Sequence, residues 1–249
     1  MSNPFDLDSA TPSSGPRATG PSGDFALDVA FSDGFEAAKR NAFPWMGAQL
    51  AGVLAVGVSM AMCFLPVIAV APVVMFGIFK LSLQAVDGDA EFSTMFSGFN
   101  DFQGTWLSFG ALLLMFIGIG MGMLILTSPL QFSDLILVEL GVINNMEDAA
   151  LATIPIKLIG SLLSNLVTVR FMLAPFMMVD RGDGAYEAMI NSWNLTGPVW
   201  LRLFGANIAL SLINLLGFLA CGIGILFTVL VMYGGQASIY RQLTGTRRA

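Results

Sequence analysis

The sequence predicts an all-α integral membrane protein, a helical bundle of about six transmembrane helices with short amphipathic helices at the membrane interface. Two observations predict this fold class. Residues 41–79 and 203–240 carry no charged side chain, and each run is long enough for two spans, because about 20 apolar residues cross roughly 30 Å of hydrocarbon. Hydrophobic residues make up 55% of the chain and charged residues only 11%, far below the quarter or so of soluble domains.

The expected domain boundaries follow from changes in composition. Residues 1–27 are predicted to form a disordered cytoplasmic tail, because their start is rich in Ser, Pro, Gly and Asp and lacks the apolar core of a signal peptide. A transmembrane helical domain should occupy residues 28–243, and residues 244–249 should form a short basic cytoplasmic tail. Cys63 and Cys221 lie in apolar runs without metal-ligand spacing, which favours small apolar residues over ligands.

A short amphipathic helix is expected before the first span, lying along the membrane surface. Phe31 and Phe35 recur at helical spacing with the alanines that follow them, and Asp33 with Glu36 has the spacing of a capping box at a helix start. Pro66 marks the return of the first hairpin, because proline disfavours a helical residue before it. The expected spans are residues 45–64, 67–86, 105–127 and 152–179, followed by two more within 203–240.

The centre of the chain contains one clear span and one ambiguous segment. Residues 105–127 lie within an uncharged run, and the small residues of Gly118–Met123 predict a surface where helices pack closely. Pro129 should mark a kink or an end of this helix. Residues 131–145 contain two acidic residues in an apolar helical pattern, so they form either an interfacial helix or a prolongation of the third span.

Basic residues predict the orientation, because cytoplasmic loops are enriched in Lys and Arg. With six spans and the amino terminus inside, nine of the 11 basic residues fall at or near the cytoplasmic side. Of the other two basic residues, Lys157 lies on the outer side of the membrane and Arg170 lies within the fourth span. Both termini should therefore be cytoplasmic.

The two hairpins have similar entries and similar second spans. The segment from Asp33 to Ala37 resembles that from Asp183 to Ala188, and Val74 to Gly77 resembles Val231 to Gly234. Because both units enter from the same side, the pattern predicts a parallel repeat of helix plus hairpin, unlike the inverted repeats of many transporters. The alternative is coincidence between apolar segments of low diversity.

The residue inventory argues against catalysis. The chain contains no histidine, which removes the commonest general base, the Ser-His-Asp arrangement and histidine metal ligands together. It contains no GxxxxGK[ST] phosphate loop and no GxSxG nucleophile elbow. Asp180 and Asp183 do not have calcium-loop spacing, and a helix-capping turn is favoured. We expect this chain to have no enzymatic activity, no cofactor and no metal site. Its net charge of −6 argues against a nucleic-acid partner.

One intramembrane polar cluster is the candidate site. Arg170 lies about ten residues before the end of the fourth span, so a rise of about 1.5 Å per residue puts it near mid-membrane, where a charge needs a partner. Asn207, Ser211 and Asn214 form a stripe at i, i+4 and i+7, and Asn165 adds polarity on the fourth span. The cluster is either a small polar cavity on a solute path or a set of interhelical hydrogen bonds that fixes packing.

Three segments carry a family resemblance: AGVLAVG, PVVMFGIFKLSLQAVDGDAEFSTMFSGFNDF and RFMLAPFMMVDRGDGAYEAMINSWNLTGPVWLRLF. The matching residues in them are Phe96, Gly98, Phe99, Ala174, Pro175, Asp180, Glu187, Ala188 and Ser192. They resemble uncharacterised bacterial polytopic membrane proteins of unknown function, relatives of the membrane region that precedes some glycerophosphodiester phosphodiesterases. The resemblance implies a protein of the bacterial cytoplasmic membrane with about six helices, and it implies no activity.

Two function hypotheses follow. The first is a structural, scaffold or accessory component of the membrane, whose partners are lipids and other membrane proteins or a second copy of the chain. The alternative is a transporter or channel for a small solute or lipid, with its polar site around Arg170 and Asn214. The two hypotheses differ in the role of the polar cluster, which fixes helix packing in the first and lines a solute path in the second.

Overall fold

The computed structural model describes residues 25–61, 65–88, 90–219 and 223–245, so most of the predicted amino-terminal tail and of the basic tail lies outside the described residues. Every regular element in these ranges is a helix, which confirms the all-α class. The elements are α1 (Leu27–Arg40), α2 (Ala42–Ala61), α3 (Leu65–Asp87), η2 (Phe92–Phe99), α4 (Phe102–Gln131), α5 (Ser133–Glu139), α6 (Met146–Thr168), η3 (Val169–Phe171), α7 (Ala174–Arg181), α8 (Ala185–Thr196), η4 (Gly197–Val199), α9 (Trp200–Leu219) and α10 (Ile223–Thr244).

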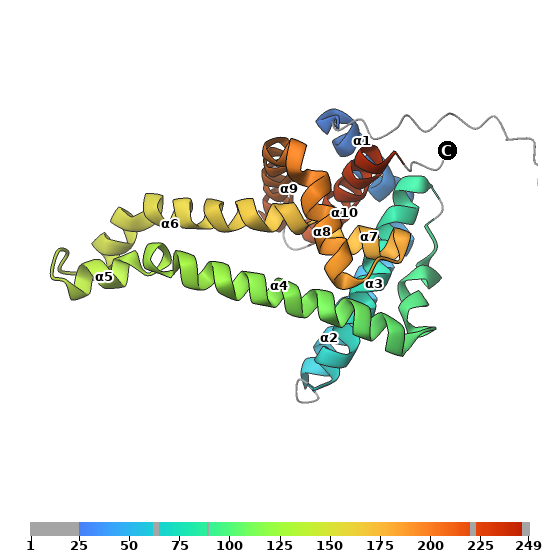
Figure 1. The fold of residues 1–249 in the computed structure, drawn as a ribbon, viewed down its shortest axis with the longest axis horizontal. Coiled ribbons are helices and arrows are strands. Elements are labelled where there is room, and N and C mark those ends of the chain that lie inside the picture. Colours follow the sequence, from blue (N-terminus) through green and yellow to red (C-terminus); the bar gives the residue numbers. More distant parts are fainter. Residues whose placement is uncertain (1–24, 62–64, 89, 220–222, 246–249) are drawn as a thin grey trace, which may run out of the picture.

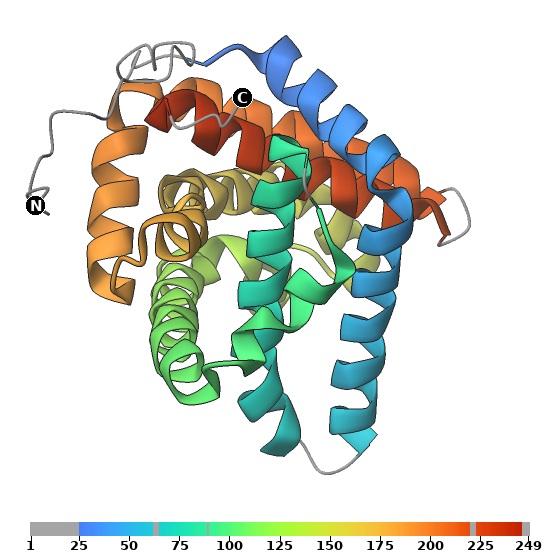
Figure 2. The same ribbon diagram turned by 90° about the vertical axis from the view of Figure 1, so that its right-hand side faces the viewer.

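The molecule consists of a body and an arm (Figure 1). The arm is made of α4, α5 and α6, with α4 and α6 antiparallel and α5 at the far end; the other helices form the body. Viewed after a quarter turn, α4 is seen nearly along its axis, whereas α2 and α3 stand upright in both views (Figure 2). The arm therefore runs crosswise to the α2–α3 hairpin, and the predicted single bundle is divided into two parts with different axes.

Four described helical segments are long and apolar enough to cross a membrane. Helices are also present at the remaining predicted span positions, as α2 and α10. The 30 residues of α4 extend about 45 Å, more than the roughly 30 Å of a hydrocarbon core. The four segments are Ala69–Asp87, Phe102–Gln131, Met146–Arg181 and Ala185–Leu215.

Helix α1 packs across α10 through small residues. A Cβ on Gly34 would lie 2.7 Å from the backbone nitrogen of Gly235, so only glycine permits this approach. Ala30, Ala37 and Ala38 are buried beside it, whereas Phe35 is 48% exposed. Small residues therefore form the closest contact with α10, and the predicted phenylalanine face is divided: Phe31 is half-buried beside α9 and α10, whereas Phe35 is exposed.

The predicted capping box at Asp33 is wrong. Helix α1 begins at Leu27, one and a half turns earlier, so Asp33 lies inside the helix. Its Oδ2 accepts a hydrogen bond of 2.7 Å from the Ser238 hydroxyl of α10. This carboxylate thus joins two helices and does not begin one.

The segment between the second and third predicted spans returns along α3 as η2. Gly77 of α3 contacts the backbone of Met95, and a Cβ on Gly98 would lie 3.0 Å from the carbonyl oxygen of Val73. The Thr94 hydroxyl donates to Oε1 of Gln84 at 2.6 Å. Glycine on both sides lets η2 lie directly against α3.

The glycines of Gly118–Met123 do not form the predicted packing surface within the chain. A Cβ on Gly118, Gly120 or Gly122 would meet no atom of the described residues within 4 Å. Helices α4 and α6 instead approach at Gly160, where a Cβ would lie 3.2 Å from Cβ of Leu130. The helix interface lies nearer the tip of the arm than the sequence suggested.

The ambiguous segment after α4 forms a separate helix. Helix α4 ends at Gln131, two residues after Pro129, and α5 begins at Ser133 and packs against α6. An ion pair of 2.7 Å between Lys157 and Asp134 fixes this contact. The segment therefore does not prolong the third span.

The element order of the proposed repeat is present, but its packing differs between the two copies. Helix α1 precedes the α2–α3 hairpin and α8 precedes the α9–α10 hairpin. Helix α1 packs mainly on α10, whereas α8 packs on α7, η3 and α4. The two lead helices do not occupy equivalent places, and the repeat stays a prediction.

Candidate functional site

A buried ionic cluster joins three helix ends of the body. The Arg241 side chain is 4% exposed, and its two terminal nitrogens donate to Asp87 Oδ2 at 2.6 Å and to Asp180 Oδ1 at 2.7 Å. The Tyr240 hydroxyl donates to the other oxygen of Asp180 at 2.9 Å. We call Asp87, Asp180, Tyr240 and Arg241 the Arg241 cluster.

Helix geometry places the Arg241 cluster. Asp87 is the last residue of α3, Asp180 lies in the last turn of α7, and Arg241 lies in the last turn of α10. Carboxyl ends of helices carry partial negative charge, which favours a guanidinium among them. Sequence reasoning missed this cluster, although all three charged residues lie at the ends of apolar runs. Both carboxylates face the same cation, so the arrangement is suited to holding helices together.

Arg170 has an aromatic partner and, in the described part of the chain, no acidic one. It follows α6 in η3, its guanidinium carbon lies 4.0 Å from the ring centroid of Trp193, and Nη2 donates to the Trp193 carbonyl at 3.2 Å. Among the residues that the structure describes, no carboxylate lies within ion-pair distance of it, and Nε has no hydrogen-bond acceptor. The partner that the sequence argument required is a ring of α8.

The predicted polar cluster is divided into separate contacts. Asn207 of α9 donates to Asn165 of α6 at 3.1 Å, and Asn214 of α9 accepts from Thr228 of α10 at 3.0 Å. The Ser211 hydroxyl donates to the carbonyl of Asn207 within its own helix at 2.7 Å. The structure thus brings Asn165 and Asn207 together, whereas Arg170 packs on α8.

The turn between α7 and α8 is capped by a glycine and not by Asp180 or Asp183: Asp180 belongs to the Arg241 cluster, and α8 begins after Gly184 without a side-chain cap. Gly182 has a φ of 73° and ends α7 in the left-handed conformation, which glycine adopts without steric cost. Asp183 Oδ2 accepts a hydrogen bond of 2.9 Å from Asn191 of α8. In the described ranges, no group of three Cys, Asp or Glu side chains could hold a metal ion.

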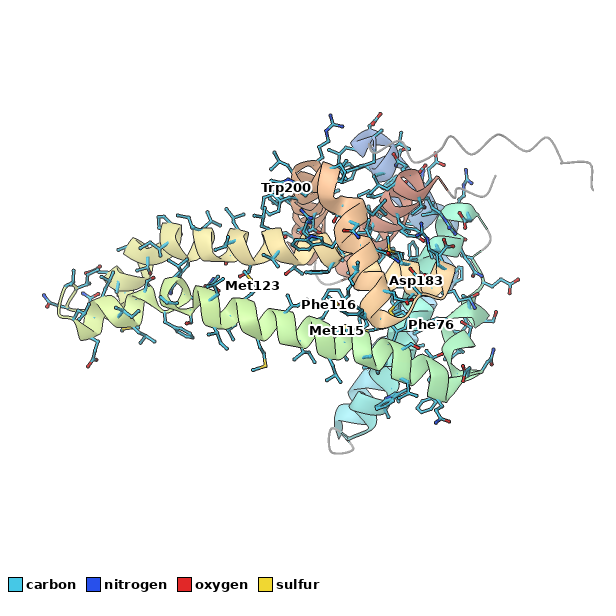
Figure 3. All side chains as sticks on the ribbon, viewed as in Figure 1. Phe76, Met115, Phe116, Met123, Asp183 and Trp200 are labelled. Carbon is cyan, nitrogen blue, oxygen red and sulfur yellow. The ribbon has the colours of Figure 1, made fainter. Side chains whose placement is uncertain are left out.

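An open apolar pocket of about 490 Å³ lies between the base of the arm and α8. Met115 and Phe116 mark this part of α4 in Figure 3, below α8. The pocket lies within the range of about 300–1,000 Å³ that is usual for small-molecule sites. Its lining residues are Met115, Gly118 and Ile119 of α4, Phe171 of η3, and Tyr186, Met189, Ile190 and Trp193 of α8.

Trp193 connects the pocket to Arg170. Its indole lines the pocket, contacts the ring of Phe171 at 5.3 Å and carries the Arg170 guanidinium on its face. The indole thus lies in contact with both the apolar cavity and the cation, and Arg170 itself does not line the cavity. This pairing, and not the asparagine stripe, is the arrangement in the described residues that suits an amphiphilic ligand.

Comparison with known proteins gives no relative. No family model matches the sequence, no curated protein matches it, and no solved structure matches the fold.

Proposed function

We propose that this chain is an integral protein of the bacterial cytoplasmic membrane that acts as a structural, scaffold or accessory component and not as an enzyme. The observation that carries the proposal is how the polar side chains inside the described helices are used. Several of them join helices to one another, as in the pairs Asn165–Asn207 and Asn214–Thr228 and in the Arg241 cluster. Such bonds fix packing between membrane helices. The bacterial origin rests on the sequence resemblance alone.

The proposal includes six spans with both termini in the cytoplasm. Support comes from the four apolar segments together with α2 and α10. A reporter at Asn145 should face outward, and one after Ala249 should face the cytoplasm. Because the arm runs crosswise to α2 and α3, a third reporter between Ala61 and Leu65 tests whether that hairpin also crosses. An inward signal there would refute the six-span topology.

The scaffold proposal predicts that the asparagine pair can be replaced. Asn165→Leu together with Asn207→Leu exchanges a hydrogen bond for an apolar contact, and such bonds in membranes are worth only about 0.6 kcal/mol on average. The folded double variant, purified from native membranes in mild detergent, should retain a partner protein at the stoichiometry of the unchanged chain. No stoichiometric partner in either sample would contradict the scaffold proposal.

A transporter of a small solute or lipid is the second candidate, and the observation that favours it is the pocket beside Arg170. This hypothesis predicts measurable flux in proteoliposomes that is lost in Arg170→Leu with Asn214→Leu while thermal unfolding shows an intact fold. Flux that survives both substitutions would exclude the polar site as the transport path.

A further inference from the structure

The pocket between α4, η3 and α8 has the features of a hydrocarbon site. Its walls are methionine, isoleucine, glycine and aromatic rings, and its volume is about 490 Å³. Hydrocarbon gains free energy in such a site in proportion to the apolar area it covers. The pocket therefore suits a flexible apolar chain.

The pocket opens beside surface that is itself apolar. On α4, Ile117 is 49% exposed and Met121 59% exposed, next to the lining residues Gly118 and Ile119. In a membrane this surface of the arm contacts acyl chains. A lipid chain can therefore enter the pocket from the surrounding bilayer without crossing water.

Arg170 supplies the charge that such a lipid would need. The 23 residues of α6 are enough to cross the hydrocarbon, and Arg170 follows the end of that helix, which suits the depth of a lipid phosphate and corrects the mid-membrane position expected from the sequence. Its guanidinium is oriented by the ring and carbonyl of Trp193. Its own carbonyl accepts hydrogen bonds from the hydroxyls of Ser192 and Thr196, at 2.8 and 3.2 Å. The site is thus held in place before any ligand arrives, and no described carboxylate within ion-pair distance competes for the cation. Phosphate, like carboxylate, matches the planar guanidinium fork, and phosphate is the anion that a phospholipid carries.

We propose that the pocket holds one acyl chain of an anionic phospholipid whose phosphate pairs with Arg170. An anionic lipid is favoured over a zwitterionic one because it carries no ammonium group to compete with the guanidinium. The inference rests on the membrane residence proposed above and goes beyond it by assigning a ligand class and a site.

Two glycines of one helix give matched variants for the test. Gly118 lines the pocket and Gly122 lies one turn further along α4, and a Cβ on either would meet no described atom within 4 Å. Gly118→Leu should fill the pocket, whereas Gly122→Leu adds the same side chain outside it. A Cβ at either position meets no described atom, and a circular dichroism melt of each variant establishes that it is folded before lipid binding is compared.

The assay uses delipidated protein in micelles and phosphatidylglycerol with brominated acyl chains, which quench nearby tryptophan. The difference in quenching between the unchanged chain and Trp193→Phe measures how much lipid occupies the pocket. We expect saturable quenching that persists in Gly122→Leu and is lost in Gly118→Leu. Arg170→Gln should weaken phosphatidylglycerol binding about tenfold or more, the range of a hydrogen bond to a charged group. It should weaken binding of brominated phosphatidylcholine by a smaller factor, because the ammonium group of that lipid competes for its phosphate.

Two results would overturn the inference: equal affinity for the two lipids, or quenching in Gly118→Leu equal to that in Gly122→Leu. Membrane residence is measured separately by alkaline extraction of membranes. Release of the chain into the soluble fraction would contradict the proposed function. Retention without selective lipid binding would contradict only the lipid site.

Discussion

Removing the Arg241 guanidinium should destabilise the body strongly, because two buried carboxylates depend on it. The side chains of Asp87 and Asp180 are only 10% and 12% exposed. Oδ1 of Asp87 has no hydrogen-bond partner among the described residues, so the guanidinium compensates most of that charge. Removing one partner of a buried ion pair costs about 3–5 kcal/mol of folding stability, because the remaining charge stays buried without compensation.

The expected change is large enough to measure by thermal unfolding. For a domain of this size, each kcal/mol lowers the melting temperature by about 2–4 °C, so Arg241→Met should unfold about 6–20 °C earlier. Circular dichroism of protein in detergent micelles measures this directly. Adding Asp87→Asn and Asp180→Asn should restore part of the loss, because neutral amides are cheaper to bury than uncompensated carboxylates.

The control is a second arginine with an exposed partner. Arg40 and Glu36 form an ion pair of 3.1 Å whose side chains are 70% and 63% exposed. Such pairs contribute about 0–1 kcal/mol, so Arg40→Met should leave the melting temperature nearly unchanged. If Arg241→Met melts within about 2 °C of Arg40→Met, the Arg241 cluster does not stabilise the body and the argument fails.

Further predictions concern the α1–α10 contact and the tip of the arm. Gly34→Ala places a methyl group 2.7 Å from the Gly235 backbone and should cost about 1–3 kcal/mol of folding stability. The control is Gly110→Ala, whose Cβ meets no described atom within 4 Å and which should be neutral or stabilising in the same thermal assay. The hydrogen bond from Lys157 lowers the pKa of Asp134, so the ion pair should stabilise the tip above the ordinary aspartate pKa of about 3.9 and lose this effect as pH falls. Amide exchange in α5, corrected for its intrinsic pH dependence, should show lower protection at pH 3 than at pH 6, and Lys157→Met should remove the difference.

The positions of the helices were largely predictable because charge marks their ends. The predicted spans 45–64 and 67–86 correspond to α2 and α3, and 105–127 falls within α4. Their arrangement was not predictable in the same way. Helix α4 is apolar on every side, so its sequence does not indicate which face meets the body and which remains free. The division into body and arm depends on contacts that leave no periodic pattern.

The contacts that the sequence missed are separated widely along the chain. Asp33 and Ser238 are 205 residues apart, and Arg241 is 154 residues from Asp87. A carboxylate three residues before a glutamate has the local spacing of a capping box, and only the packing of α1 on α10 reveals its actual partner. Local spacing predicts helix ends, whereas these polar contacts are set by which helices cross.

The candidate site was predicted in part. The position of Arg170 in the sequence predicted a partner among the charged and amide side chains at similar depth. The partner is the face of Trp193, which that prediction did not include because an aromatic ring lacks a formal charge. An aromatic face attracts a cation through its quadrupole, so tryptophan and tyrosine on neighbouring helices belong among the candidate partners.

A comparison of Arg241 with Arg170 shows why only Arg170 suits an anion. Arg241 has a carboxylate on each terminal nitrogen, so an anionic ligand would have to displace Asp87 or Asp180 and leave that acid unpaired. Arg170 is held by a ring and a carbonyl, neither of which carries a negative charge. Binding a phosphate there adds an ion pair without breaking one. Arginine therefore has two different roles in this chain. Arg241 stabilises the contact between helices at the end of α10, and Arg170 is the recognition group after the end of α6.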